Sequence, residues 1–144
     1  YKYIGKTSKN YYTDAKRTTG TTYYYKIRAY RTVNKANKYG AYSAIVYAKA
    51  LPATPVLTAK NAGTRKIKLS WKKISGAHGY EIYRATSKNG KYALAKRVTS
   101  GSTLSFTNTG LTKGKTYYYK IRAYRTVKRS RKYGAFSTVK YAKG

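Results

Sequence analysis

The segment Thr116-Tyr-Tyr-Tyr-Lys-Ile-Arg-Ala-Tyr-Arg-Thr-Val127 decides the fold of this chain, and the same twelve letters occur earlier as Thr22–Val33. Alternate residues of a strand form two faces. In the second copy one face is Tyr117, Tyr119, Ile121 and Ala123, and the other is Tyr118, Lys120, Arg122 and Tyr124. Because Tyr, Ile, Val and Thr favour strands and the apolar residues recur with a period of two, the segment predicts a half-buried β-strand with a cationic, aromatic outer face.

The repeat extends beyond this segment. Residues 22–50 align with 116–144 without a gap, and 20 of the 29 positions are identical. Upstream, Tyr12-Thr-Asp14 aligns with Phe106-Thr-Asn108, and after a gap of three residues Tyr1 falls opposite Tyr92. This alignment predicts one complete repeat over 51–144 and only the second half of a repeat over 1–50, so that the chain begins in mid-domain.

Residues 51–144 read as short strands separated by turns. We expect strands at 56–60, 66–72, 80–84, 91–98, 104–108, 116–127 and 135–143, and a basic loop at 128–132. The predicted core is Trp71, Tyr80, Ile82, Leu111, Tyr117, Tyr119 and Ile121. Seven short strands without an amphipathic helix predict an all-β fold, a seven-stranded antiparallel β-sandwich.

Four motifs in this region resemble the fibronectin type III domain, which has an immunoglobulin-like fold. They are Trp71 at the end of the second strand, Gly79-Tyr-Glu-Ile-Tyr-Arg84 as the third strand, Leu111-x-x-Gly114-x-x-Tyr117 as the tyrosine corner, and Ser137–Ala142 as the last strand. Segments 71–77 and 84–90 resemble repeats of secreted or surface proteins of Gram-positive bacteria. The resemblance implies a complete fibronectin type III-like domain over 51–144 and the C′, E, F and G strand equivalents over 1–50.

The first repeat departs from this pattern. Arg17 stands where Leu111 stands in the second repeat, which argues against a tyrosine corner there. Counterparts of the first three strands, with Trp71, are absent, and half a sandwich leaves an open apolar face and unpaired edges. Either the chain is a fragment, or another molecule supplies the missing strands, as in a homo-oligomer formed through the incomplete first repeat.

Charge dominates the composition. The chain has 33 Lys and Arg against 2 Asp and Glu, for a net charge of +31, and 20 of its residues are Tyr. Such a surplus attracts polyanions, although a merely well-solvated surface is the alternative. The aromatic content argues against simple disorder.

Residues for catalysis or metal binding are scarce. The chain has no Cys or Met, its acids are Asp14 and Glu81, and its one His, His78, lies in a Gly-flanked loop. We therefore expect no enzyme activity, no metal and no cofactor. No apolar run is long enough to predict membrane insertion.

The outer face of the long strand is the predicted binding site. The candidate residues are Tyr118, Lys120, Arg122, Tyr124, Arg125, Lys128, Arg129, Arg131 and Lys132, with Tyr24, Lys26, Arg28 and Tyr30 in the first repeat. Cations attract phosphates, sulfates and carboxylates, and Tyr rings offer flat faces for sugars or bases. Cross-strand packing alone, or a protein interface, are the alternatives.

These features predict a non-catalytic adhesion or spacer module on the Gram-positive cell surface, secreted and bound to the cell wall. Its expected partners are anionic polymers: wall teichoic acid, an acidic glycan, or nucleic acid bound without sequence specificity. Two other functions fit the same residues, a fibre subunit completed by strand exchange between chains and a specific binder of a host protein.

Overall fold

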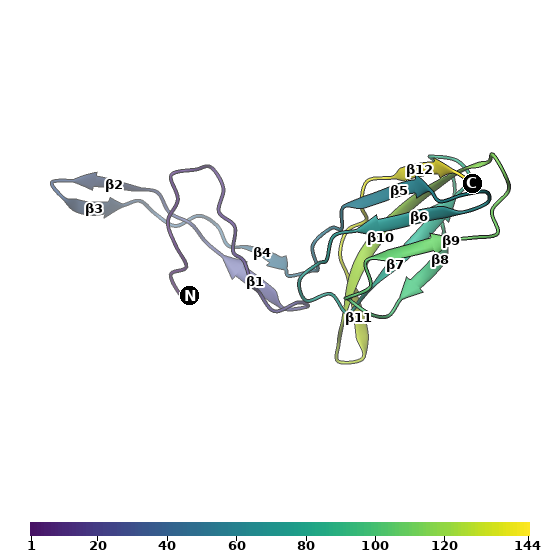
Figure 1. The fold of residues 1–144 in the computed structure, drawn as a ribbon. Helices are drawn as coiled ribbons and strands as arrows, with labels where there is room; N and C mark the ends of the chain where they lie inside the picture. Colours follow the sequence, from purple (N-terminus) through teal and green to yellow (C-terminus); the bar gives the residue numbers. More distant parts are fainter. The chain divides into compact units, whose positions relative to one another are not determined.

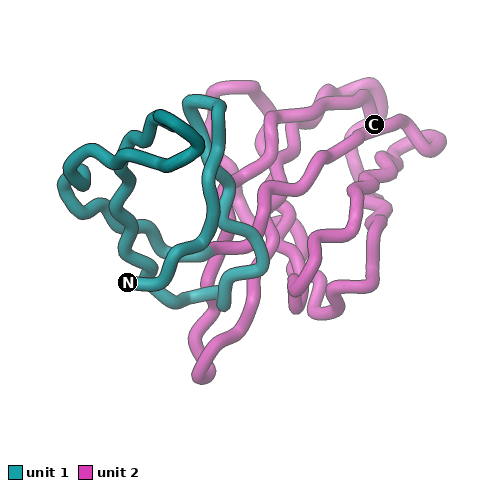
Figure 2. Tube along the Cα trace, turned by 90° about the vertical axis from the view of Figure 1, so that its left-hand side faces the viewer, with its two compact units in different colours: residues 1–50 teal, residues 51–144 magenta.

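The computed structural model describes all residues from 1 to 144 and divides them into two compact units, residues 1–50 and 51–144 (Figure 2). The division falls where the first sequence repeat ends. Neither unit contains a helix that could cross a membrane.

The second unit is a sandwich of two antiparallel sheets (Figure 1). The first sheet has the order β5-β6-β9, with β5 at Leu57–Asn61, β6 at Ile67–Trp71 and β9 at Ser105–Asn108. The second sheet contains β7 (Gly79–Ala85), β8 (Ala93–Val98), β10 (Thr116–Val127), β11 (Ser130–Tyr133) and β12 (Lys140–Lys143). Strand β10 is central: β7 lies along one edge with β8 beyond it, and β12 and β11 pair with successive parts of the other edge. The predicted all-β sandwich is confirmed.

The core lies between the two sheets, and all seven residues predicted to fill it are buried. Leu57, Ile67, Leu69, Val98 and Ala123 complete the cluster. The inward residues of β10 alternate with half-exposed ones up to Ala123, as the period of two requires.

Buried tyrosine hydroxyls find hydrogen-bond partners, as buried polar groups usually do. The Tyr80 hydroxyl accepts from the Ile74 amide at 3.1 Å, and the Tyr119 hydroxyl accepts from the Asn108 side chain at 2.9 Å. The Tyr117 hydroxyl accepts from the Thr112 amide at 3.1 Å, which forms the predicted tyrosine corner. Hydrogen bonds from Thr112 also lower the pKa of Tyr117.

The predicted basic loop at 128–132 is instead the tip of a β-hairpin. Strand β11 pairs with the end of β10, from Tyr124↔Tyr133 to Val127↔Ser130. The two turn residues, Lys128 and Arg129, have φ of 46° and 62°, as a type I′ turn requires. The loop prediction was wrong because neither residue is the Asn or Gly that usually marks such a turn.

The first unit contains two short ribbons. Strand β1 (Thr22–Tyr25) pairs with β4 (Val46–Lys49), and β2 (Tyr30–Val33) pairs with β3 (Ala36–Tyr39). Both registers equal those of β10 with β12 and β11 after the 94-residue offset of the repeat. The first unit thus reproduces the β10, β11 and β12 edge of the sandwich.

Residues 1–21 contain no strand, in contrast to the expected C′ and E equivalents. In the second unit the C′ position is β8, which pairs with β7, and the E position is β9, which pairs with β6. The first unit has no counterpart of β6 or β7, so neither segment has a strand to pair with.

The tyrosine corner nevertheless forms in the first unit. The Thr18 amide donates to the Tyr23 hydroxyl at 3.1 Å, the same distance as in the second unit. Arg17, whose presence argued against this corner, stacks its guanidinium over the Tyr23 ring at 5.7 Å. The expectation was wrong because the bond needs only the tyrosine and a backbone amide, and not a leucine before them.

Candidate binding face on the outer side of β10

The outer side of β10, with its neighbours on β7, β8 and β12, carries four of the nine predicted binding residues of the second unit. We call this surface the outer face. Its residues come from alternate positions of β10, which the pleat directs away from the core. Four residues follow one another along this side of the strand: Tyr118, Lys120, Arg122 and Tyr124.

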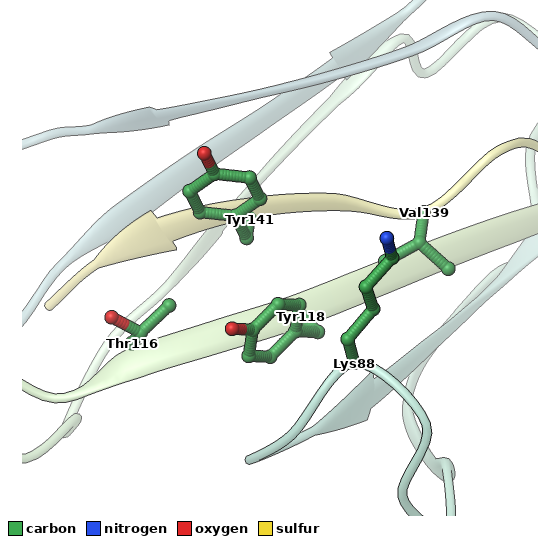
Figure 3. Close-up of a pocket in the computed structure, with 5 residues that line it drawn as sticks. All are labelled: Lys88, Thr116, Tyr118, Val139 and Tyr141. Atoms are coloured by element: carbon green, nitrogen blue, oxygen red, sulfur yellow. The ribbon is translucent and has the colours of Figure 1, made fainter.

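Tyr118 lies beside Tyr141 of β12, with ring centroids 5.7 Å apart. Together with Lys88, Thr116 and Val139 these rings line an open pocket of about 430 Å³ (Figure 3). Lys88 extends from the β7–β8 connection alongside Tyr118. The pocket therefore combines two aromatic faces, a hydroxyl and an ammonium group, which suits a sugar ring that carries a negative charge.

Lys120, the next outward residue of β10, lies between two aromatic rings. Its ammonium lies 4.4 Å from the Tyr92 centroid and 4.5 Å from the Phe136 centroid. Both contacts are cation–π interactions, which hold the side chain without neutralising its charge. The cation thus remains available to an external anion.

Arg122 is already engaged by Glu81 of β7, which lies directly opposite it in the ladder. The guanidinium donates to the Glu81 carboxylate at 2.8 Å and stacks over the Tyr133 ring at 3.8 Å. Arg97 of β8 forms a second ion pair with the same carboxylate at 2.9 Å, and the hydroxyl of Tyr83 donates to it at 3.3 Å. Arg122 is therefore part of a structural network and not a free cation.

Glu81 is only 1% exposed, yet it remains a carboxylate. Burial favours the neutral acid, but the hydrogen bonds from Arg122 and Arg97 outweigh burial and lower the pKa of Glu81 below its ordinary value. The hydroxyl of Tyr133 adds a further donor at 3.2 Å. The network ties together β7, β8, β10 and β11 at one point.

Tyr124 does not belong to the accessible surface. Its side chain is 4% exposed and lies over Gly79, where an added Cβ would approach the Tyr124 hydroxyl to 2.6 Å. The hydroxyl contacts the Val98 carbonyl at 3.4 Å, and Arg131 covers the ring at 5.4 Å. The prediction of a ligand-facing Tyr124 was wrong because a side chain of the β10–β11 hairpin, Arg131, covers the Tyr124 ring.

The remaining predicted cations lie on the β10–β11 hairpin, which projects from the sandwich (Figure 1). Lys128 and Arg129 form its exposed tip. Arg125 lies half-buried near Gly76, and Lys132 donates to Ser130 at 3.2 Å. The tip is thus the least constrained cationic group of the predicted set.

The first unit repeats the outer face with the same geometry. Tyr24 pairs with Tyr47 at 5.8 Å, matching Tyr118 and Tyr141. Lys26 lies between Tyr1 and Tyr42, at 4.6 and 4.1 Å, just as Lys120 lies between Tyr92 and Phe136. This agrees with the alignment of Tyr1 with Tyr92.

Two predicted residues of the first unit differ in surroundings from their counterparts. Arg28 stacks over Tyr39 at 3.9 Å and over Tyr42 at 4.7 Å, but no carboxylate lies near it. Tyr30 pairs with Tyr39 at 6.2 Å and is 41% exposed, whereas its counterpart Tyr124 is buried.

Comparison with known proteins bears on the fold. The sixth fibronectin type III domain of human fibronectin type III domain containing protein 3 matches with a TM-score of 0.53 and 16% identity, over 66% of this chain and 86% of that one. A β-1,2-glucanase from Parabacteroides distasonis matches with a TM-score of 0.53 and 21% identity, over 76% of this chain and 16% of the enzyme.

The chain has a fibronectin type III-like fold.

No family model matches the sequence of this fibronectin type III-like chain. Among curated proteins, Exoglucanase B of Cellulomonas fimi is 28% identical over 132 residues, 83% of this chain and 11% of the enzyme. The Amylopullulanase of Thermoanaerobacterium saccharolyticum is 36% identical over 72 residues, 50% of this chain and 6% of the enzyme. The chain thus spans about a tenth or less of these relatives.

Sequence reasoning missed several residues of the outer face. Tyr92, Phe136 and Tyr141 hold or flank the predicted residues, and Lys88 completes the pocket. For three of them a signal existed, because Tyr1, Tyr42 and Tyr47 are aromatic at the equivalent positions of the first repeat. Lys88 lies on a loop, so no strand periodicity could place it.

Proposed function

We propose that this chain is a non-catalytic module of a secreted bacterial protein, which it attaches to anionic polymers such as wall teichoic acid or acidic glycans. Nucleic acid is bound by the same charge without sequence specificity. The contacts come from the outer face of each unit and from the basic tip of the β10–β11 hairpin.

One observation carries this proposal: the chain has almost no negative charge left to neutralise its cations. Asp14 pairs with Arg17 at 3.0 Å, and Glu81 pairs with Arg97 and Arg122. Every other Lys and Arg lacks a carboxylate partner within the chain, whose net charge is +31. A concentrated cationic surface raises the local concentration of polyanions and accelerates their binding.

The arrangement of aromatic rings supports a polysaccharide more than a simple salt effect. Both units present a tyrosine pair beside a cation held between rings. Two copies of one face on one chain also favour a repetitive polymer, because the second contact becomes intramolecular once the first has formed.

The relatives support a module attached to a larger protein. Two of them are named as an exoglucanase and an amylopullulanase, which are bacterial enzymes of polysaccharide breakdown, and the matched segment is a small part of each. We propose from this that the chain works outside the cell beside other domains.

The test is a titration of the full chain with teichoic acid, heparin and single-stranded DNA at several salt concentrations. Each phosphate neutralised on duplex DNA gives a log–log salt slope of about −0.9, and single strands give about −0.7 per phosphate. Six to ten contacts would therefore weaken single-strand binding by about 300-fold to 10⁴-fold between 50 and 200 mM salt. We expect steep slopes for all three polymers.

Matched variants separate charge from ring contacts. Lys128→Ser with Arg129→Ser should flatten the slope, whereas Lys60→Ser with Lys68→Ser removes the same charge from the β5–β6 sheet and should have a smaller effect. Tyr118→Ala with Tyr141→Ala should leave the slope unchanged but weaken binding to teichoic acid. No binding at low salt would leave the charge as a device for solubility, and salt-resistant binding to one host protein would favour a protein receptor.

A further inference from the structure

In the second unit β7 covers one edge of β10, and the equivalent strand edge of the first unit is open. We call it the open edge, residues 24–30. Its sequence is identical to that of residues 118–124, yet Ile27 is 74% exposed whereas Ile121 is fully buried. Strand β1 also ends at Tyr25 and β2 begins at Tyr30, whereas β10 is continuous through the equivalent positions.

The backbone on the other side of this segment is already paired as in the second unit. Ser43 donates its amide to the Ile27 carbonyl at 2.7 Å, and Gly40 donates to the Ala29 carbonyl at 3.0 Å. Ser137 and Gly134 make the same two bonds to Ile121 and Ala123. Since successive residues of a strand direct their amides to opposite edges, Lys26 and Arg28 present theirs to the open edge, and neither amide has a hydrogen-bond partner.

The charge of the open edge is also uncompensated. In the second unit Glu81 lies opposite Arg122 and pairs with it at 2.8 Å. In the first unit Arg28 occupies the same position, and Asp14, the only acid there, already pairs with Arg17. Lys6 adds a second cation nearby, 6.0 Å from the Tyr30 ring. The edge therefore favours a strand that brings a carboxylate.

We propose that the open edge binds an antiparallel strand with a glutamate opposite Arg28 and a glycine opposite Tyr30, in a segment with the chemistry of residues 51–91. The second unit shows the register: Glu81 faces Arg122, and Gly79 faces Tyr124, where an added Cβ would meet the Val98 carbonyl of β8 and the tyrosine hydroxyl. The β5 and β6 counterparts of the segment cover Ile27, as Leu57 and Leu69 share a core with Ile121.

The occupant is a free segment of this kind and not β7 of a second copy. In each copy β7 lies between β10 and β8, and its residues Tyr80 and Ile82 are fully buried. Releasing β7 to a neighbour would therefore unfold the second unit of the donor.

The test uses the full chain and a synthetic peptide of residues 51–91, followed by amide hydrogen exchange. We expect one-to-one binding that protects the amides of Lys26 and Arg28, which exchange fast in the free chain. A Glu81→Gln peptide should bind about 30-fold or more weakly, because Arg28 then lacks its buried counter-charge. The peptide carries nine Lys and Arg against one Glu, so its binding should strengthen as salt screens repulsion, in contrast to polyanion binding.

Several results would overturn the proposal. One is that the unaltered peptide does not protect the amides of Lys26 and Arg28, and another is that the Glu81→Gln peptide binds equally well. A third is that these amides become more protected as the chain concentration rises without peptide, which would mean that a second copy covers the edge. As a second measurement, residues 51–91 are joined ahead of Tyr1 in the full chain. The joined chain should protect Lys26 and Arg28 at every concentration, and fast exchange of both amides there would also refute the proposal.

Discussion

Trp71 is the largest side chain in the core of the second unit, and it packs against Tyr80 with ring centroids 5.2 Å apart. Its indole Nε1 is buried without a hydrogen-bond partner, so its contribution comes from packing alone. We expect Trp71→Ala to lower the free energy of unfolding by about 3–5 kcal/mol, as large-to-small core changes do. Urea unfolding followed by circular dichroism measures this, and a loss below about 1 kcal/mol would contradict the core assignment.

The sequence alone gave no role to Glu81, but the structure shows that its carboxylate accepts hydrogen bonds from four residues. Because four donors converge on its carboxylate, Glu81→Gln should lower the free energy of unfolding at neutral pH by about 1.5–3 kcal/mol, the range for hydrogen bonds to a charged group. The same measurement on Tyr92→Phe, whose hydroxyl bonds only to the exposed Lys88 carbonyl, serves as the control.

The pH dependence of that difference has a definite sign. The pKa of Glu81 in the folded chain lies below its ordinary value near 4.5, so the unfolded chain binds the proton more tightly. The stabilisation by ionised Glu81 is complete above about pH 5 and is lost as the pH falls through 4.5 towards the folded pKa. The gap between the parent chain and Glu81→Gln should therefore narrow in acid, and a gap that widens would exclude this network as its cause.

At the scale of elements, the turn of the β10–β11 hairpin has a backbone conformation that lowers stability, and the proposed binding of polyanions would explain why cations are found there. Lys128 and Arg129 adopt the left-handed backbone conformation, which residues other than Gly and Asn occupy at a cost in free energy. The equivalent turn of the first unit begins with Asn34, a residue that tolerates this conformation. Two cations thus occupy positions where turn chemistry alone would favour Asn-Gly.

We expect Lys128→Asn with Arg129→Gly to stabilise the second unit by about 1 kcal/mol and to lower its affinity for polyanions at the same time. Thermal unfolding and a heparin titration of one preparation measure both quantities. Improved stability with unchanged heparin affinity would show that the hairpin tip takes no part in binding.

At the scale of the whole molecule, the two units should contribute unequally to cooperative unfolding. The second unit has a continuous core, whereas the first has two ribbons and mostly exposed apolar side chains. The 94 residues of the second unit predict an unfolding enthalpy of about 65 kcal/mol near 60 °C. A chain of 144 residues that unfolded as one cooperative unit would give about 100 kcal/mol.

We therefore expect residues 51–144 alone and the full chain to give the same calorimetric enthalpy. A peptide of residues 1–50 should show no cooperative transition, since two-stranded ribbons are marginal in water. An enthalpy of the full chain near the larger value would mean that the first unit has its own core.

Much of this molecule could be predicted from the sequence. The alternation in residues 116–127 indicates the strand and its inward residues, and the 94-residue repeat indicates the boundary at Ala50. The fold class and the buried positions of Trp71, Tyr80 and Ile121 follow from these local patterns, because the side-chain period of a strand and its apolar content are properties of neighbouring residues.

Only the tertiary structure decided which copy of the twelve-residue segment becomes a full strand, and which outer residues stay accessible. Ile27 and Ile121 have the same neighbours in sequence, but only Ile121 lies beside β7 and beneath the β5–β6–β9 sheet. In the same way, Glu81 neutralises Arg122, whereas Arg28 has no carboxylate partner. Tyr124 is buried against Gly79, whereas its counterpart Tyr30 is exposed. Local sequence sets the preference for a strand, but burial and ion pairing depend on partners far along the chain, and one repeat has those partners while the other lacks them.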